Sequence, residues 1–217
     1  MSWWLAGGIS PGDCVLAYAP IGASDETAAR VNLANPGTYD ATAGSAPSWN
    51  TATGWSFNGS QWLRSNFSVN SVSYTLIVRF ANIGTGSGDD YRIGNAIHYV
   101  IPRFESNKRG FSYYGFNFLG ASTNIVSGTM AQAGENSYYN GAADGTLTAT
   151  LYSAFEYFIG ARSATPEQPM VGDIVAYAVY SRVLNSTEVA ALHTAMMGLP
   201  ETNKIPVFMN QYRQRRA

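Results

Sequence analysis

The side chains of this 217-residue chain that could carry out acid–base chemistry are its 14 carboxylates, and their spacing argues against a hydrolase. Hydrolysis of a glycosidic bond uses two carboxylates that flank the bond. The acids here stand singly or as adjacent pairs, Asp25-Glu26 and Asp89-Asp90. Because neighbours in a strand point to opposite faces, neither pair can flank one bond from a strand. A pair assembled across loops, such as Asp13 with Glu105, stays open, but we expect a non-enzymatic protein with no catalytic residues.

Other catalytic and metal-binding patterns are sparse as well. His98, His193 and Cys14 are the only imidazole and thiol side chains, which is too few for the Cys and His pairs of a structural zinc site. Neither a G-x-S-x-G elbow nor a Walker-type loop occurs. Since one cysteine cannot form an internal disulfide, we expect Cys14 to be a buried small hydrophobe.

Tyrosine and asparagine side chains offer a different chemistry, the recognition of sugars. Aromatic rings stack on sugar rings, and amides bind hydroxyl groups. The candidate carbohydrate-binding residues lie in two strand-like stretches: Tyr113, Tyr114, Asn117, Tyr138, Tyr139 and Asn140. Because the chain has 14 tyrosines, we expect packing between strands to account for most of them.

The elements that must position these residues are organised around the stretch 172–192. From Asp173 to Tyr180 the residues alternate and both sides are largely apolar, which predicts a central strand covered on both faces. The alternation places Ile174 on the face opposite Tyr177. The other expected elements are placed relative to this strand.

A short amphipathic helix is expected directly after this strand. Asn185 can cap it, and Glu188 can reach back to complete a capping box. Gly198 and Pro200 should end it. The helix is predicted near 187–197, and it packs through three apolar residues at helical spacing: Val189, Leu192 and Met196.

The earlier part of the chain predicts further strands and one long irregular segment. Cys14 to Ala19 and Ser73 to Ile83 are typical of strands, and Arg79 should reach solvent or a carboxylate from the polar side of the second. Residues 24–54 are rich in turn formers and predict an irregular excursion over the sandwich, held down by Tyr39 and Trp49. Gly59 in the Asn58-Gly59 pair marks a tight turn.

Three sequence patterns resemble the concanavalin A-like lectin/glucanase superfamily in its laminin G-like branch. The first is a "G-x-I-x-x-x-x-x-Y-x-R-x-L" strand followed by "S-x-x-E-V", and the second is "W-x-F-N-G-x-x-x-L" at 55–63. The third, at 32–40 and 46–49, is similar to segments of tailed-phage and environmental viral structural proteins. The residues of the first pattern are Gly172, Ile174, Tyr180, Arg182, Leu184, Glu188 and Val189.

The resemblance covers roughly residues 15–198 and implies an all-β fold, a two-sheet antiparallel jelly-roll sandwich with one short C-terminal helix. It also implies that the first and last strands are neighbours. The superfamily's hydrolases carry an "E-x-D-x-x-E" strand, which is absent here. No cofactor is expected, although the resemblance makes calcium a candidate at Asp89 and Asp90, whose alternative is a solvated loop tip.

Composition predicts one domain with short arms. We expect an N-terminal arm over residues 1–12, a jelly roll over 13–199 and a basic, apolar C-terminal arm over 200–217. Charged residues make up 12% of the chain and the net charge is -1, so neither nucleic acid nor a membrane surface is an expected partner. The arms are predicted to dock onto other copies of the chain or a larger assembly through Trp3, Trp4, Val207, Phe208, Tyr212, Arg213, Arg215 and Arg216.

Two functions are compatible with these observations. The first is a non-enzymatic virion structural protein, a capsid decoration protein or a tail or fibre component, that uses a lectin-like fold for attachment or subunit contacts. The second is a lectin-type carbohydrate-binding module that binds cell-surface glycans. The expected location is the virion in the first case, and the extracellular space or cell surface in the second.

Overall fold

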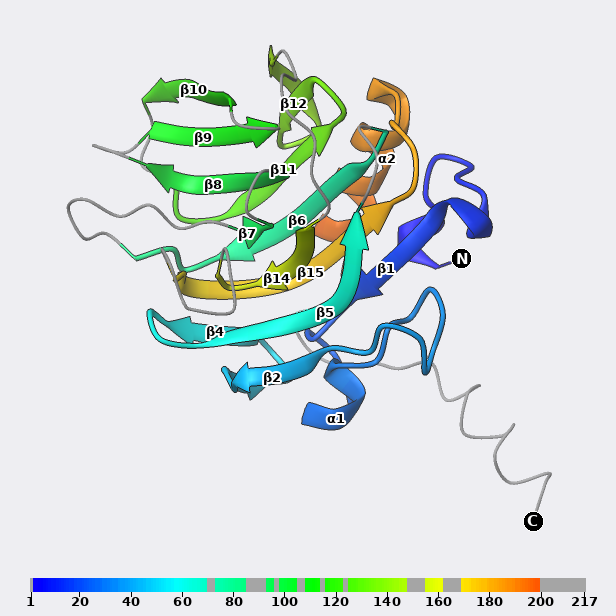
Figure 1. Cartoon of the computed structure of the whole chain (residues 1–217), viewed down its shortest axis with the longest axis vertical. Coiled ribbons are helices and arrows are strands. Elements are labelled where there is room, and N and C mark those ends of the chain that lie inside the picture. Colours follow the sequence, from blue (N-terminus) through cyan, green and yellow to red (C-terminus); the bar gives the residue numbers. More distant parts are fainter. Residues whose placement is uncertain are drawn as a thin grey trace.

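The structure, a computed structural model, is a sandwich of two antiparallel β-sheets with one substantial helix on its outside (Figure 1). It describes residues 2–69, 73–84, 93–95, 98–104, 108–113, 116–122, 125–147, 155–161 and 169–199. The larger sheet has the strand order β13-β12-β11-β6-β15-β4-β3, and β1 also pairs with β15. Its strands are β1 (Cys14–Tyr18), β3 (Ser48–Asn50), β4 (Gly54–Asn58), β6 (Thr75–Ala81), β11 (Gly128–Ala133), β12 (Asn136–Tyr139), β13 (Ala142–Thr146) and β15 (Val171–Tyr180).

The smaller sheet has the strand order β10-β9-β8-β7-β14-β5-β2. Its inward-facing side chains and those of the larger sheet form one hydrophobic core, in which Trp55, Phe80 and Phe111 are almost fully buried. These contacts confirm the two-sheet jelly roll that the sequence predicts. The strands of this sheet are β2 (Thr42–Ser45), β5 (Trp62–Val69), β7 (Ile93–Gly94), β8 (His98–Phe104), β9 (Lys108–Tyr113), β10 (Phe116–Ser122) and β14 (Phe155–Ile159).

Strand β15 is the central strand that its apolar alternation predicts. It pairs with β6 on one side and with β4 and β1 on the other, and nine of its ten residues are buried. The expected alternation is wrong at one point, because the register against β6 shifts between Ile174 and Ala176. This bulge moves Ile174 into the core cluster that contains Tyr177. A bulge adds one residue to a strand and reverses the alternation beyond it.

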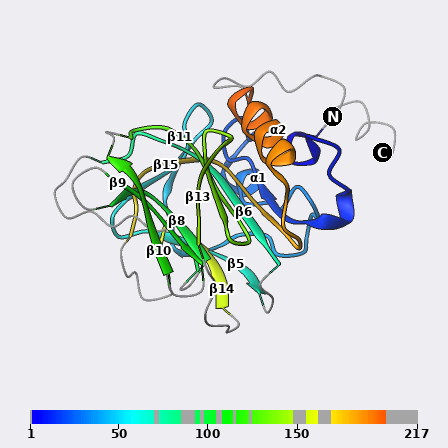
Figure 2. The same ribbon diagram turned by 90° about the horizontal axis from the view of Figure 1, so that it is seen from above.

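Helix α2 (Ser186–Met197) is confirmed with its caps. Asn185 accepts a hydrogen bond from the backbone N–H of Glu188, and the Glu188 side chain accepts one from the backbone of Asn185. Val189, Leu192 and Met196 are buried against the outer face of the larger sheet. Figure 2 shows α2 on the side of this sheet that faces away from β5 and β14.

The N-terminal segment packs against this helix. The 3-10 turn η1 (Trp3–Leu5) contacts α2, and the Tyr180 hydroxyl donates a 3.0 Å hydrogen bond to the backbone carbonyl of Trp4. Trp3 and Trp4 are half-buried against this second cluster of the core. An assembly role for these two residues stays a prediction, and the other expected arm residues, from Val207 onward, lie outside the described residues.

The expected irregular segment 24–54 is partly ordered. It contains α1 (Glu26–Ala29) and the edge strands β2 and β3. Outside this segment, a 3-10 turn, η2 (Pro11–Asp13), precedes β1. The main anchor of the segment 24–54 is a fully buried amide, because the Asn32 side chain bonds the backbone of Val15, Ala17 and Thr38. Trp49 anchors the segment through a hydrogen bond to Pro20, and Tyr39, although 39% exposed, packs edge-on against Phe67 of β5.

Candidate functional site

A cavity of about 360 Å³ opens on the outer face of the larger sheet, beside the C-terminal end of α2. We call it the Asp173 cavity. Its volume lies within the range of small-molecule sites, which is about 300–1,000 Å³. It is lined by Ile21, Ala52, Thr53, Arg79, Phe80, Ala81, Asn82, Ser127, Gly128, Asp173, Val175 and Met197.

The polar centre of this cavity is the pair Asp173 and Asn82. The Asn82 Nδ2 atom donates a 2.6 Å hydrogen bond to Asp173 Oδ2. Asp173 is only 6% exposed, and among the described residues its Oδ1 atom has no hydrogen-bond donor. A nearly buried carboxylate is costly unless its lone pairs are satisfied. Oδ1 therefore keeps the capacity to accept a further hydrogen bond.

The backbone of β15 and β6 explains why these two side chains meet. Asp173 and Val175 share a face by ordinary alternation, and the bulge between Ile174 and Ala176 puts them on the same outer face as Ala176 and Ala178, where they line the cavity together. Asn82 directly follows β6 and has a positive φ of 52°, a conformation that asparagine tolerates better than most residues. Bulges often redirect side chains next to binding sites, which fits this position.

The turn before β4 forms another wall. Gly54 has a φ of 88°, and a Cβ atom there would lie 2.4 Å from the carbonyl oxygen of Ile174. Glycine therefore permits the turn that carries Ala52 and Thr53 to approach β15 closely. Ile21, Val175 and Met197 supply apolar surface beside the polar pair, and Met197 is 48% exposed.

Arg79 forms the boundary between the cavity and the helix. Its side chain is on the outer face as expected, but at 7% exposure it does not reach solvent. Instead its Nη1 atom donates hydrogen bonds to the backbone carbonyls of Met196, at 2.8 Å, and Leu199, at 3.3 Å. The last carbonyls of a helix lack hydrogen-bond donors within the helix, and they form the negative end of its dipole. A cation there both donates hydrogen bonds to these carbonyls and interacts favourably with the dipole. The solvent-exposed alternative for Arg79 is thus wrong, and the alternative of a carboxylate partner stays a prediction.

The hairpin residues that the sequence offers as sugar ligands have structural contacts. Tyr138 is buried, and the Asn140 Oδ1 atom accepts a 3.0 Å hydrogen bond from the backbone N–H of Thr129. Half-buried Tyr139 lies under the Arg109 guanidinium, 4.6 Å from the ring centre, and Arg109 forms an ion pair with Asp144. None of the three tyrosine and asparagine side chains lines the Asp173 cavity.

The other candidate residues are placed only in part. Tyr113 lies in β9 opposite His98, and Asn117 lies in β10 opposite Ser112. Tyr114 and the calcium candidates Asp89 and Asp90 lie outside the described residues. Roles in ligand binding for all of these residues stay predictions.

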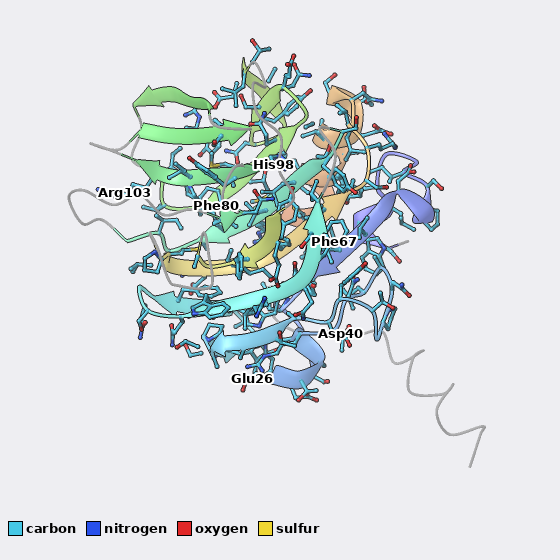
Figure 3. The ribbon with its side chains drawn as sticks, in the orientation of Figure 1. Glu26, Asp40, Phe67, Phe80, His98 and Arg103 are labelled. Carbon is cyan, nitrogen blue, oxygen red and sulfur yellow. The ribbon has the colours of Figure 1, made fainter. Side chains whose placement is uncertain are left out.

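The two histidines are part of the packing. His98, which Figure 3 labels near Phe80, is buried between the sheets, where its ring contacts the hydroxyl of Tyr157. Burial lowers its pKa to about 4, so the ring is neutral near pH 7. His193 on α2 pairs with the Thr129 hydroxyl at 2.8 Å, and partial burial lowers its pKa as well. In the described part of the chain, no group of three or more His, Cys, Asp or Glu residues could hold a metal.

Sequence reasoning missed the central residues of this cavity. Asp173 stands alone in an otherwise apolar strand, and a charged residue inside a buried strand is a signal that could have been used. Asn82 carries a weaker signal, because an asparagine after a strand is common in turns. Their proximity depends on the pairing of β6 with β15, which the sequence does not show.

Comparison with solved structures identifies the class of fold. A sialidase from Trypanosoma rangeli, solved with 2,3-difluorosialic acid, matches with a TM-score of 0.60 and 14% identity over 88% of this chain. This chain spans only 34% of that sialidase. Domain 4 of an extracellular GH43 arabinanase from Geobacillus stearothermophilus, solved with arabinotriose, matches with a TM-score of 0.55 and 16% identity, covering 83% of this chain and 98% of that domain.

No family model and no curated protein sequence matches the chain. The sheet topology and the solved structures nevertheless identify the fold as a jelly-roll β-sandwich. At these identities the likeness concerns the fold alone. Within the described residues, none of the helices has the length and apolar character needed to cross a membrane.

Proposed function

We propose that this chain is a non-catalytic carbohydrate-binding module whose site is the Asp173 cavity. The observation that carries the proposal is the nearly buried Asp173 carboxylate, with one oxygen held by Asn82 and the other without a hydrogen-bond donor among the described residues. Charge-assisted hydrogen bonds to an ionised carboxylate are roughly twice as strong as neutral ones. Sugar hydroxyls are suitable donors for them.

The rest of the cavity suits a sugar as well. Thr53 and Ser127 add hydroxyl groups, and Ile21, Val175 and Met197 add aliphatic surface for the C–H face of a sugar ring. The fold likeness to an arabinanase domain that was solved with arabinotriose supports the same class of ligand.

The carboxylate count supports binding without catalysis. Among the residues described by the structure, Asp173 is the one carboxylate that lines the cavity. Hydrolysis with two carboxylates needs a second acid about 5–10 Å away to act as nucleophile or base. We therefore propose that the cavity holds its ligand and does not cleave it.

A glycan array with matched variants tests this proposal. We expect the native protein to bind a subset of oligosaccharides, and Asp173→Asn to weaken that binding about tenfold, because a charge-assisted hydrogen bond becomes a neutral one. Asp25→Asn is the control, since Asp25 is an exposed helix cap that asparagine can replace. Equal affinity of the Asp173→Asn variant and the native protein would refute the site.

A second pair of variants tests the apolar wall. Met197 lines the cavity, whereas Val183 does not, and both side chains are exposed. Met197→Ala should weaken glycan binding several-fold while Val183→Ala leaves it unchanged. Equal effects of the two substitutions would place the ligand elsewhere.

A virion role is a second proposal, which rests on the resemblance of residues 32–40 and 46–49 to viral structural proteins. In this case the module would attach a particle to glycans or to neighbouring subunits, and residues 200–217 would dock onto another copy. Sedimentation of a chain that ends at Leu199 tests the docking. If this shortened chain assembles in the same way as the full chain, the tail has no assembly role.

A further inference from the structure

We infer that the Asp173 cavity selects uncharged pentose or hexose residues and rejects sugars that carry a carboxylate, such as sialic and uronic acids. This inference rests on the proposed function and adds the class of ligand. It matters because one structural neighbour is a sialidase, which makes an acidic sugar the natural competing ligand.

The charges around the cavity lead to this selectivity. Asp173 and Arg79 are the two charged residues among those described as lining it. The Arg79 guanidinium directs Nη1 to the carbonyls of Met196 and Leu199, at the negative end of the dipole of α2. Its positive charge is thus directed toward the helix, and the charge presented by the pair at the cavity centre is negative.

The hydrogen-bonding groups of the cavity also favour an uncharged sugar. Asp173 Oδ1 can only accept hydrogen bonds when the carboxylate is ionised, so its partner must be a donor such as a hydroxyl. A carboxylate on the ligand would offer acceptors and a like charge. Two like charges about 4 Å apart repel each other in water and repel more strongly in a partly buried site, so we expect acidic sugars to bind at least about tenfold more weakly.

Matched ligands test the selectivity. Each neutral hexose that binds on the array is compared, as its methyl glycoside, with the methyl glycoside of the corresponding uronic acid, which differs only by a carboxylate in place of the hydroxymethyl group. A neutral oligosaccharide is likewise compared with its sialylated form. We expect the neutral member of each pair to bind about tenfold or more tightly, by titration calorimetry. Equal or tighter binding of the acidic members would overturn the inference while leaving a sugar site in place.

The Asp173→Asn variant and added salt provide independent measurements. The amide keeps the shape and can still accept from Asn82, but it removes the negative charge. Compared with the native protein, we expect this variant to bind the neutral sugar more weakly and the acidic sugar more tightly. The ratio of the two affinities should therefore be smaller in the variant. For the native protein, raising the salt from about 20 to about 500 mM should strengthen binding of the acidic sugar alone, because salt screens repulsion.

The failures of the two proposals can be told apart. If no glycan binds the native protein, the proposed function fails and the selectivity fails with it. If glycans bind but the neutral-to-acidic ratio is the same for the native protein and for Asp173→Asn, only the selectivity fails. If Asp25→Asn changes the ratio as much as Asp173→Asn does, the cause is not the cavity carboxylate.

Discussion

Acidic side chains of similar burial have different surroundings in this structure. Glu188 is held by Arg182 and by the backbone of Asn185, and Asp144 by Arg109. Asp173 has only the amide of Asn82 among the described residues. A carboxylate whose two oxygens both accept hydrogen bonds has a role in stability. A carboxylate with only one oxygen hydrogen-bonded can still accept a hydrogen bond from a ligand. At the scale of single residues, this difference separates the candidate site from the structural ion pairs.

This contrast predicts that Asp173 reduces stability. In Asp173→Asn, the hydrogen bond from Asn82 can persist while the cost of burying a charge disappears. We expect the free energy of unfolding in urea to stay the same or to rise by about 0.5–2 kcal/mol, although glycan binding weakens. A loss of more than about 1 kcal/mol would show that the carboxylate is structural.

His98 predicts a dependence of stability on pH. The pKa of this ring is lowered by burial to about 4, below its usual 6.5, so the unfolded chain binds the proton more readily. The stability from the neutral ring is therefore complete above about pH 6.5 and falls by up to about 1.4 kcal/mol per unit as the pH drops toward 4.

Urea unfolding between pH 7 and 4 measures this slope. We expect His98→Gln to be less stable at pH 7, because the contact with Tyr157 is altered, but to lose less stability on acidification. His193→Gln is the matched control, and it should keep most of the slope because His193 is only partly buried. An unchanged slope in His98→Gln would contradict the assignment.

At the scale of elements, the sequence predicts what depends on local chemistry. The capping box at Asn185 and Glu188 and the burial of β15 on both faces follow from residues that are close in sequence, and both are confirmed. The bulge at Ile174 is not local, because it depends on the register against β6. Strand β5 was missed although its residues alternate, since the polar Ser65 occupies a buried position in the row.

The contrast between features set by neighbouring residues and features set by strand pairing also explains why the sequence did not predict the candidate site. The sequence offers tyrosines as sugar ligands, yet Tyr138 packs in the cluster under α2 and Tyr139 packs against the core between the sheets. Strand β2 has no hydrophobic alternation because all four of its residues are exposed at a sheet edge. The Asp173 cavity combines parts of β6, β15 and the turn before β4, so its composition follows only from the strand order.

The ion pair between Arg182 and Glu188 links α2 to the strand before it. The Arg182 Nη1 and Nη2 atoms donate to both Glu188 oxygens, at 2.9 and 2.6 Å, and Nε donates to Asp13 at 2.7 Å. We expect Glu188→Gln to lower the free energy of unfolding by about 1–2 kcal/mol at pH 7. Glu26→Gln, which removes an exposed ion pair with Arg30, should cost about 0.3–0.5 kcal/mol.

The effect of Glu188→Gln should depend on pH. Arg182 lowers the pKa of Glu188, so the stabilisation is present above the unfolded value of about 4.3 and is lost as the pH falls through the folded pKa. The difference between native and variant proteins should therefore shrink in strong acid. If the two substitutions cost the same at pH 7, the network contributes no more than a surface ion pair.

At the scale of the whole molecule, the outer face of the larger sheet carries both the helix and the cavity. Helix α2 and η1 cover Ala176 and Ala178, while the cavity occupies the neighbouring part of the face at Asp173 and Val175. The first and last strands are neighbours, as the resemblance implies, because β1 pairs with β15 (Figure 1). The fold thus places the Asp173 cavity on the larger sheet, beside a capped helix.

This arrangement predicts that the purified protein cleaves no polysaccharide. The described lining of the cavity offers a single carboxylate, and a second acid is needed for the usual chemistry. Reducing-end assays with arabinan, β-glucan and sialylated substrates should show no turnover. Turnover that Asp173→Asn abolishes would make this cavity an active site and contradict the proposed binding role.

The central claim is that a glycan binds in the Asp173 cavity, and the most direct measurement is the map of backbone amide chemical shifts during a glycan titration. We expect the largest changes at Asn82, Asp173 and Thr53, which border the cavity on three separate segments. At the same sub-saturating ligand concentration the changes should be several-fold smaller in Asp173→Asn and unchanged in Asp25→Asn. Changes that cluster around Tyr139 and Arg109, with the cavity amides unmoved, would contradict the account.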